Sequence, residues 1–345
     1  MVWLEQVIQK VESFIFSLKR KSRLWRDEVK TSKEQIILDS VNNDGCNKCK
    51  NKKERHKFEE DALCSVVTSI KDGLSVRCVG PWAYDKIYRL VQYFGIFSQG
   101  MYKKWGGINY IEICSGPGRC VIRESGEEIN GTALAILKDP RFKYVEKAIF
   151  IDKKETVIST LNKRIEKLGL TAKASAEFGD YTDHVGLLDK LQCLPKKNLK
   201  LVFIDPTECN IPFKTIEAIS KHLENVDFII NVTLGTDANR NLTPSVLDPS
   251  FIKVREKYES FLGNKDFFNN PEVIVAAKAG NYLELRKLFA ETYRNELMKI
   301  GYSHIDTRPI LHYYYLLFAS KHKKGLDFWK KACTYSPDGQ KTFNF

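Results

Sequence analysis

The sequence lacks any long hydrophobic run. Its 345 residues contain no stretch of about 18 consecutive apolar residues, so they predict no membrane-spanning helix. The first residues do not have the pattern of a secretory signal, because Glu5, Lys10 and Glu12 interrupt the apolar positions. Low-complexity tracts and short internal repeats are also absent. These absences favour an ordinary globular protein, which we expect to be cytoplasmic and to have no membrane partner.

Acidic residues are too few to balance the basic ones. The chain has 43 Asp and Glu against 55 Lys and Arg, which gives a net charge of +12. An excess of positive charge favours polyanionic partners, and nucleic acid is the first candidate. A basic, soluble surface without such a partner would explain the same excess, so the charge alone leaves both interpretations open.

A second Cys-x-x-Cys motif is also missing. The chain has nine cysteines, and without a secretory signal we expect them to be reduced. Cys46 and Cys49 form a single Cys-x-x-Cys pair, whose spacing lets two thiolates bind one tetrahedral metal ion. Cys64, Cys78 and His56 are the candidates to complete a zinc site. Unligated thiols or a redox pair are the alternative.

Residues 1–40 carry apolar side chains at helical spacing. One face of the predicted helix holds Trp3, Leu4, Val7, Ile8, Val11, Phe14, Ile15 and Leu18. The basic segment 19–21 follows this face directly. Such a helix could dock a protein partner or lie near a phosphate backbone, and packing against its own domain is the alternative. Residues 1–80 are therefore predicted to form a helical, cysteine-containing extension.

One glycine-containing segment organises the rest of the chain. Tyr110–Cys114 is apolar and β-branched apart from Glu112, which predicts a buried strand. Gly116 and Gly118 follow where the chain leaves that strand, and glycine there lets a ligand approach the backbone closely. An acidic strand residue followed by Gly-x-Gly is the first signature of a class I methyltransferase, whose loop holds S-adenosylmethionine. We therefore predict that Glu112, Ser115, Gly116 and Gly118 bind this cofactor.

A dinucleotide cofactor is less well supported by the same segment. The Gly-x-Gly-x-x-Gly pattern of such sites needs a third glycine, and Val121 stands at that position. The next helix is not expected before Thr132. Both observations count against NAD or FAD.

Strands and helices alternate through the second half of the chain. Short apolar segments predict strands at 148–151, 172–178, 201–204, 227–232, 302–306 and 311–320. Helical periodicity predicts helices at 81–102, 156–168, 213–223 and 282–300, with an insertion near 240–280. The alternation predicts an α/β fold, namely a doubly wound, mostly parallel Rossmann-like methyltransferase sheet with a terminal antiparallel strand pair.

Acidic residues stand at the ends of successive predicted strands. Asp152 follows the second strand, and its two oxygens could accept hydrogen bonds from both ribose hydroxyls of the cofactor. Asp180 follows the third strand and could accept the adenine amino group. Each could instead be a helix cap or a loop carboxylate, but parallel strands deliver their ends to one edge, so as a set they favour a cofactor site.

Asp205 and Pro206 end the fourth strand, where methyltransferases that act on exocyclic amines keep an Asp-Pro-Pro-aromatic element. We predict that Asp205 and Pro206 are catalytic, because alignment of the amine with the methyl group is the main contribution there. Thr207–Glu208 stands in place of the proline and the ring that would stack on a flipped base. Phe213 or one of Tyr313–Tyr315 could supply that ring, although the tyrosine run also fits a half-buried strand.

Several short motifs, in order along the chain, carry a resemblance to a known family. They are Trp82-x-x-x-Lys86-x-x-x-Leu90-x-x-Tyr93, Ser115–Arg119, Gly131–Ile136, Phe150–Asp152, Phe203–Pro206 and Tyr315–His322. In these residues the segment 81–332 resembles the three-Cys-motif partner family of methyltransferase-like proteins, and the tail 333–345 falls outside it. The resemblance implies a class I methyltransferase-like Rossmann domain and supplies no substrate.

Two functions follow as hypotheses. The first is an S-adenosylmethionine-dependent methyltransferase that acts on nucleic acid, with an exocyclic amine as the preferred acceptor. The alternative is a catalytically degenerate methyltransferase fold that serves as a nucleic-acid-binding or partner-binding scaffold.

Overall fold

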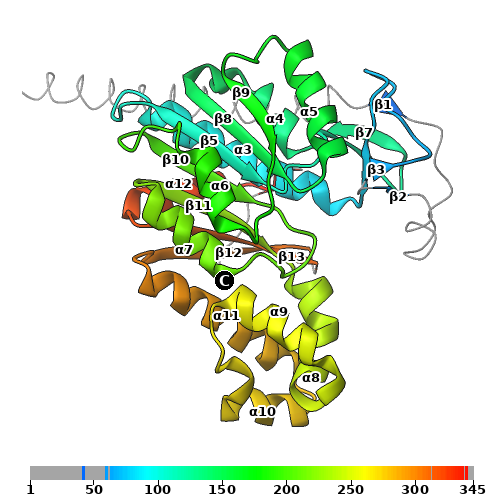
Figure 1. Cartoon of the computed structure of the whole chain (residues 1–345), viewed down its shortest axis with the longest axis vertical. Coiled ribbons are helices and arrows are strands. Elements are labelled where there is room, and N and C mark those ends of the chain that lie inside the picture. The colour runs from blue at the N-terminus through cyan, green and yellow to red at the C-terminus, as the bar shows by residue number, and fades with distance from the viewer. Residues whose placement is uncertain (1–40, 43–58, 61–62, 312, 338, 341–345) are drawn as a thin grey trace, which may run out of the picture.

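The computed structural model describes residues 41–42, 59–60, 63–311, 313–337 and 339–340 (Figure 1). The amphipathic helix predicted in residues 1–40 lies outside this part of the chain. The same holds for Cys46 and Cys49, so the metal-binding prediction for that pair is not tested.

A seven-stranded sheet forms the centre of the molecule. Its strands are β5 (Ile108–Ile113), β8 (Val145–Asp152), β9 (Ala174–Phe178), β10 (Leu199–Ile204), β11 (Val226–Val232), β12 (His304–Ile310) and β13 (Tyr314–Ser320). They are arranged in the order β12-β13-β11-β10-β5-β8-β9, and β13 is antiparallel to both of its neighbours. The other adjacent pairs are parallel. This is the strand order of the class I methyltransferase sheet, so the predicted fold class is confirmed.

Helices cover both faces of the sheet because its strands are apolar on both sides. Ile111 and Ile113 of β5 belong to one buried cluster, and Ile108 and Tyr110 belong to the other. The first cluster includes residues of α6 (His184–Leu191), α7 (Phe213–His222) and α11 (Tyr282–Lys299). The second includes residues of α3 (Trp82–Met101), α4 (Thr132–Leu137), α5 (Glu155–Lys167) and α12 (Lys323–Ala332). The sheet is therefore doubly wound.

Two of these helices, α6 and α12, are not anticipated by the sequence analysis. Helix α12 anchors through Trp329, which is 0% exposed and stacks on Phe318 of β13 with ring centroids 5.3 Å apart. Only Gly325, Trp329 and Ala332 of this ten-residue helix are buried, so its apolar face is short.

Residues 119–130 form a hairpin, which the sequence analysis did not predict. Strands β6 (Arg119–Ile122) and β7 (Glu127–Asn130) pair with each other, and β4 (Arg77–Val79) adds in parallel to β6. Strand β1 (Val41–Asn42) completes this second sheet. The buried carboxylate of Glu128 pairs with Arg119 and accepts a hydrogen bond from Ser69. Ser69 is 59 residues from Glu128 in the sequence, and a partner this distant stabilises polar strands that have no periodic signal of their own.

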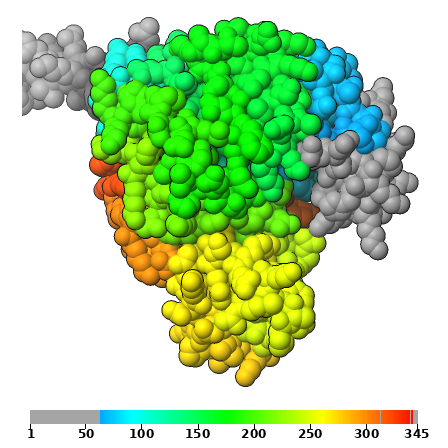
Figure 2. Space-filling model, in the orientation of Figure 1, coloured from blue at the N-terminus to red at the C-terminus, as the bar shows by residue number. Residues whose placement is uncertain are grey.

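The insertion near 240–280 is helical and projects from the sheet as a lobe, seen at the lower end of Figures 1 and 2. It contains α8 (Asn239–Leu247), α9 (Ile252–Leu262) and α10 (Pro271–Lys278), which pack with α11. Asp237, in the π-helical turn Leu234–Ala238, ties the lobe to the sheet. Its carboxylate accepts hydrogen bonds from Lys257 Nζ at 2.9 Å and from the backbone N–H of Cys209 at 3.0 Å. The lobe is therefore fixed to the loop that follows β10.

No helix in the part of the chain that the structure describes has both the length and the hydrophobicity to cross a bilayer.

Candidate functional site

The strand register brings the predicted site residues to one edge of the sheet. Ile113 of β5 lies opposite both Ile204 of β10 and Ile151 of β8. The next residues of the three strands are Cys114, Asp205 and Asp152, so their side chains emerge side by side. The carboxyl edge of a parallel sheet is where ligands bind in α/β proteins.

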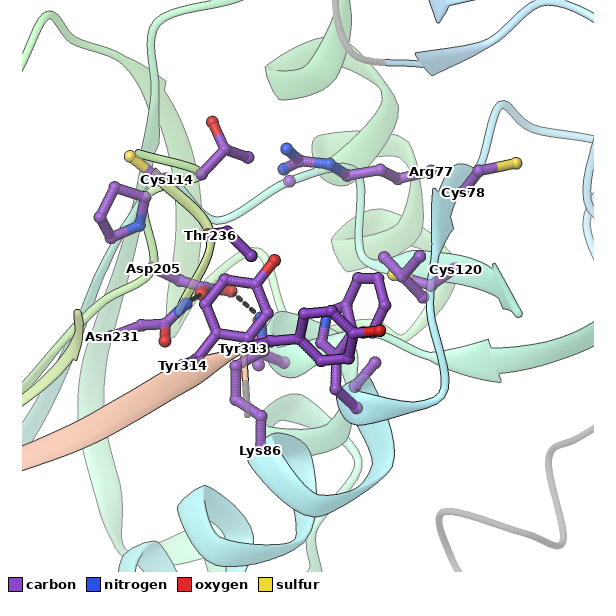
Figure 3. Close-up of a pocket in the computed structure, with 18 of the residues that line it drawn as sticks. Arg77, Cys78, Lys86, Cys114, Cys120, Asp205, Asn231, Thr236, Tyr313 and Tyr314 are labelled. Carbon is purple, nitrogen blue, oxygen red and sulfur yellow. Dashed lines mark hydrogen bonds and ion pairs between the residues drawn. The ribbon is translucent and has the colours of Figure 1, made fainter. Parts of the chain in front are cut away.

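A cavity of about 700 Å³ opens at this edge (Figure 3). It lies between the loop after β5, the first turns of α3, strand β4, and the ends of β10 and β11. Among the predicted residues it is lined by Ser115, Gly116, Gly118, Asp205 and Pro206. The structure therefore brings five of the eight predicted cofactor and catalytic residues around one space.

The two glycines of the loop have different roles. Both adopt a positive φ, +65° at Gly116 and +93° at Gly118, which disfavours other residues. A Cβ at Gly118 would lie 2.9 Å from Leu161 Cδ1, so this glycine is needed for packing against α5. A Cβ at Gly116 would meet only Arg77 Nη1, at 3.9 Å. Gly116 therefore faces open space, as a ligand-binding glycine should.

Asp152 lies directly against the glycine loop. Its Oδ2 accepts a hydrogen bond from the backbone N–H of Gly116 at 3.1 Å, and its Oδ1 accepts one from Lys154 N–H at 3.3 Å. It does not line the cavity. A carboxylate oxygen has a second lone pair, so both oxygens keep the capacity to accept ribose hydroxyls. The position agrees with that role, although loop positioning already occupies one acceptor site on each oxygen.

Asp180 is the predicted residue least joined to the others. It is exposed and does not line the cavity, and its Oδ1 accepts hydrogen bonds from the N–H and hydroxyl of Thr182, both at 2.8 Å. The neighbouring Tyr181 accepts a hydrogen bond from Lys153 Nζ at 3.2 Å. These two hydrogen bonds agree with the alternative interpretation, a loop carboxylate, and contact of Asp180 with the adenine stays a prediction.

Glu112 does not reach the cavity. It is 0% exposed within β5, and the hydroxyls of Thr132 and Tyr110 donate hydrogen bonds to its two oxygens. Burial raises the pKa of this carboxyl to about 8, although both hydrogen bonds act in the opposite direction. The prediction of direct cofactor contact is corrected: Glu112 instead joins the central strand to α4, whose first residue is Thr132.

Asp205 sits in a fixed network on the opposite side of the cavity. Lys86 Nζ, from α3, donates to its Oδ2 at 2.5 Å, and Asn231 Nδ2, from β11, donates to its Oδ1 at 2.8 Å (Figure 3). The side chains of Lys86 and Asp205 are 14% and 13% exposed, so water screens this pair only weakly. Lys86 was not predicted as a site residue, although it belongs to the motif that carried the family resemblance.

Aromatic rings form one wall of the cavity. Trp82 of α3 lies 4.7 Å from the ring of Tyr313 and 5.8 Å from that of Tyr314, measured between centroids. All three line the cavity, and the guanidinium of Arg123 lies 6.0 Å from the Trp82 ring. Of the ring candidates named from the sequence, Phe213 is instead buried in the core beside Tyr293. Trp82 was not predicted as a site residue, although it belongs to the motif that carried the family resemblance.

Cys64 and Cys78 are the candidates for the predicted zinc site that lie within the described residues. Cys64 and Cys78 pack with Val67, Val76 and Val121 in a small apolar cluster. Among the residues that the structure describes, no group of three or more His, Cys, Asp or Glu side chains could hold a metal ion.

The residues around the cavity fit S-adenosylmethionine. Within the described ranges, Ser115 Oγ and Asn231 Oδ1 are buried without a hydrogen-bond partner. Buried polar atoms are normally satisfied, so orphaned atoms that face a cavity indicate a ligand. The cofactor carries the ammonium, carboxylate and hydroxyl groups that such atoms and the Arg77 guanidinium could meet.

Comparisons with known proteins identify no family. No family model and no curated protein matches the chain. Among solved structures, protein LPL1258 from Legionella pneumophila has a TM-score of 0.43 at 10% identity, covering 75% of this chain and 95% of that one. An O-methyltransferase from Bacillus cereus has a TM-score of 0.36 at 11% identity, with coverages of 70% and 82%.

The B. subtilis M1A22 tRNA methyltransferase TrmK has a TM-score of 0.33 at 14% identity, with 65% of each chain covered. Scores this low carry no argument, so the assignment of the fold rests on the strand order and register. The chain has the sheet of a class I methyltransferase, and its activity is a separate question.

Proposed function

We propose that this protein is an S-adenosylmethionine-dependent methyltransferase. The observation that carries the proposal is the contact between Asp152 Oδ2 and the Gly116 amide at 3.1 Å, beside a cavity of about 700 Å³. It joins the predicted ribose-binding carboxylate to the predicted cofactor loop. When bound, the cofactor would supply a methyl group on a sulfonium, and the neutral thioether S-adenosylhomocysteine would leave as the methyl group is transferred.

Each residue of the site would have a distinct task. Gly116 lets the methionine part approach the backbone, and the buried Ser115 hydroxyl is available to it as a hydrogen-bonding group. Asp152 would hold the ribose hydroxyls. Asp205 lies across the cavity from the loop, where it would hold the methyl acceptor.

An exocyclic amine fits Asp205 as the acceptor group. The carboxylate oxygens accept one hydrogen bond each, from Lys86 and Asn231, and each keeps one lone pair for an amine N–H. Lys86 also keeps Asp205 in a defined orientation, and correct alignment is the main catalytic contribution in such a transfer. The orphaned Asn231 Oδ1 offers a second acceptor beside it.

A base of nucleic acid fits the aromatic wall. Trp82, Tyr313 and Tyr314 provide rings of the kind on which unstacked bases lie, and Arg123 adds a cation next to them. The cluster would replace the ring missing after Pro206. The net charge of +12 favours a polyanionic acceptor in addition.

Calorimetric titration with S-adenosylmethionine and S-adenosylhomocysteine tests the proposal. We expect micromolar binding, and a loss of about 10- to 100-fold in Asp152→Ala, since a carboxylate that accepts two hydroxyl hydrogen bonds is removed. Asp183→Ala is the matched control, because Asp183 caps α6 through Gly186 N–H and lies outside the cavity.

Absence of binding to the wild-type protein would contradict the proposal. If salt-sensitive binding to DNA or RNA were retained, the result would favour the scaffold alternative. Membership of the three-Cys-motif partner family, a protein partner for residues 1–40 and zinc at Cys46 and Cys49 stay predictions.

A further inference from the structure

We infer that Arg77 binds the carboxylate of the methionine part of the cofactor. The inference rests on the proposed function and adds to it the residue that would recognise the amino-acid end. Arg77 lies on β4, opposite Cys120 of β6, and both side chains line the cavity. Figure 3 shows the Arg77 side chain extending from β4 toward Cys114, across the space above the loop.

Arg77 differs from the other cations of the cavity in having no partner. Lys86 is bound to Asp205, and Arg240 Nε donates to the carbonyl of Thr236 at 2.9 Å. Arg123 lies over Trp82 and 3.8 Å from Glu124. Within the described residues, the Arg77 guanidinium makes no hydrogen bond and no ion pair. A partly buried charge is normally paired, so the structure presents an anion site.

Among the groups of the cofactor, the position of the Arg77 guanidinium favours the carboxylate as its partner. Arg77 Nη1 would lie 3.9 Å from a Cβ at Gly116, so it stands over the predicted methionine-binding turn. The nearby acid, Asp152, is engaged with the Gly116 and Lys154 amides. Burial raises the pKa of the Cys120 thiol, and the charge of Arg77 is the largest influence that opposes it, which agrees with a guanidinium directed into the cavity.

A second group in the same corner supports a carboxylate ligand. Ser115 Oγ is buried and without a hydrogen-bond partner among the described residues, and it lines the same cavity. Guanidinium and carboxylate form two parallel hydrogen bonds, and a neighbouring hydroxyl can donate to a remaining lone pair. A lysine at position 77 would supply the charge without the fork geometry.

Titration of two ligands that differ only in the carboxylate tests the inference. The probes are S-adenosylmethionine and decarboxylated S-adenosylmethionine, each titrated into the wild-type protein, Arg77→Gln and Arg77→Lys. We expect the wild-type protein to prefer S-adenosylmethionine by about 10- to 100-fold. Arg77→Gln should lose that preference by weakening only the carboxylated ligand, and Arg77→Lys should keep part of it.

Arg240→Gln is the matched control, because it removes another cavity-lining charge, one already bound to the Thr236 carbonyl, and should leave the preference unchanged. Equal affinity of the wild-type protein for the two ligands would overturn the inference, and this result does not depend on whether a variant folds. An unchanged preference in Arg77→Gln would overturn it too. Both results leave the proposed function intact, whereas failure of the wild-type protein to bind either ligand would overturn both.

Discussion

The two sides of the cavity use charge in opposite ways. On the loop side, formed by β4, β5 and the end of β8, Arg77 has no partner among the described residues. On the far side, formed by α3, β10 and β11, Lys86 and Asn231 already bind Asp205 at 2.5 and 2.8 Å. The difference indicates two functions in one space. Arg77 is available to bind an anionic ligand. Asp205, in contrast, is held in a fixed orientation by Lys86 and Asn231 without a ligand.

Glu112 and Asp205 also differ in their partners. Glu112 is buried under the loop with the hydroxyls of Thr132 and Tyr110 as hydrogen-bond partners, and burial raises its pKa to about 8. Asp205 has the Lys86 ammonium as a direct partner. Glu112 is suited to hold backbone elements together as a neutral acid, whereas Asp205 is held in place by its ion pair with Lys86.

The largest effect is expected from Asp205→Ala. Methyl transfer should fall roughly 100- to 1000-fold because the acceptor loses its orienting group, while affinity for S-adenosylmethionine should change less than about threefold. Transfer of tritiated methyl to bulk RNA and DNA measures the first quantity, and calorimetry measures the second. Glu208→Ala is the control, since Glu208 lines the same cavity but its side chain is 54% exposed.

Full transfer activity in Asp205→Ala would contradict the proposal that the two sides of the cavity have different functions. Loss of cofactor affinity together with activity would contradict it too.

Trp82→Ala should have the next largest effect. Removal of the ring should weaken binding of single-stranded nucleic acid by about 10- to 100-fold, the range for loss of one stacked base. Fluorescence anisotropy with labelled oligonucleotides at fixed salt measures it. Trp82→Phe keeps a ring and should retain most of the affinity.

If Trp82→Ala bound oligonucleotides as tightly as the wild-type protein, the aromatic wall would have no part in holding the acceptor.

The last effect concerns Glu112 and appears in the pH dependence of stability, not in binding or transfer. Its folded-state pKa of about 8 lies above the ordinary value of 4.5, so the folded state holds a proton that the unfolded state has lost between these pH values. Stability from this group is therefore complete below pH 4.5 and falls as the pH rises toward 8, by at most about 1.4 kcal/mol per pH unit. Denaturant unfolding of the wild-type protein and Glu112→Gln measures it.

Glu112→Gln keeps a side chain that can accept from Thr132, and it has no titrating proton. The stability of the wild-type protein relative to this variant should decrease between pH 5 and 8. A constant difference over that range would show that Glu112 does not titrate as the buried environment requires.

Much of the sheet was predictable because each strand is a continuous apolar segment. The strands ending at Asp152, Asp205 and near Asp180 were located from their sequence, and the parallel order followed from the alternation with helices. The hairpin of β6 and β7 was missed because two partners of the buried Glu128, Ser69 and Ile70, come from a distant segment. Helix α12 was missed because its apolar face is short.

For the site, the sequence by itself determined which chemical groups stand at the strand ends and the glycine turn, since local chain geometry fixes both. Tertiary structure alone decided which of those groups share a cavity. Lys86 meets Asp205 across 119 residues, and Arg77 approaches Gly116 from a strand of the second sheet. These contacts depend on how whole helices and strands pack together, and a local sequence pattern does not predict that packing.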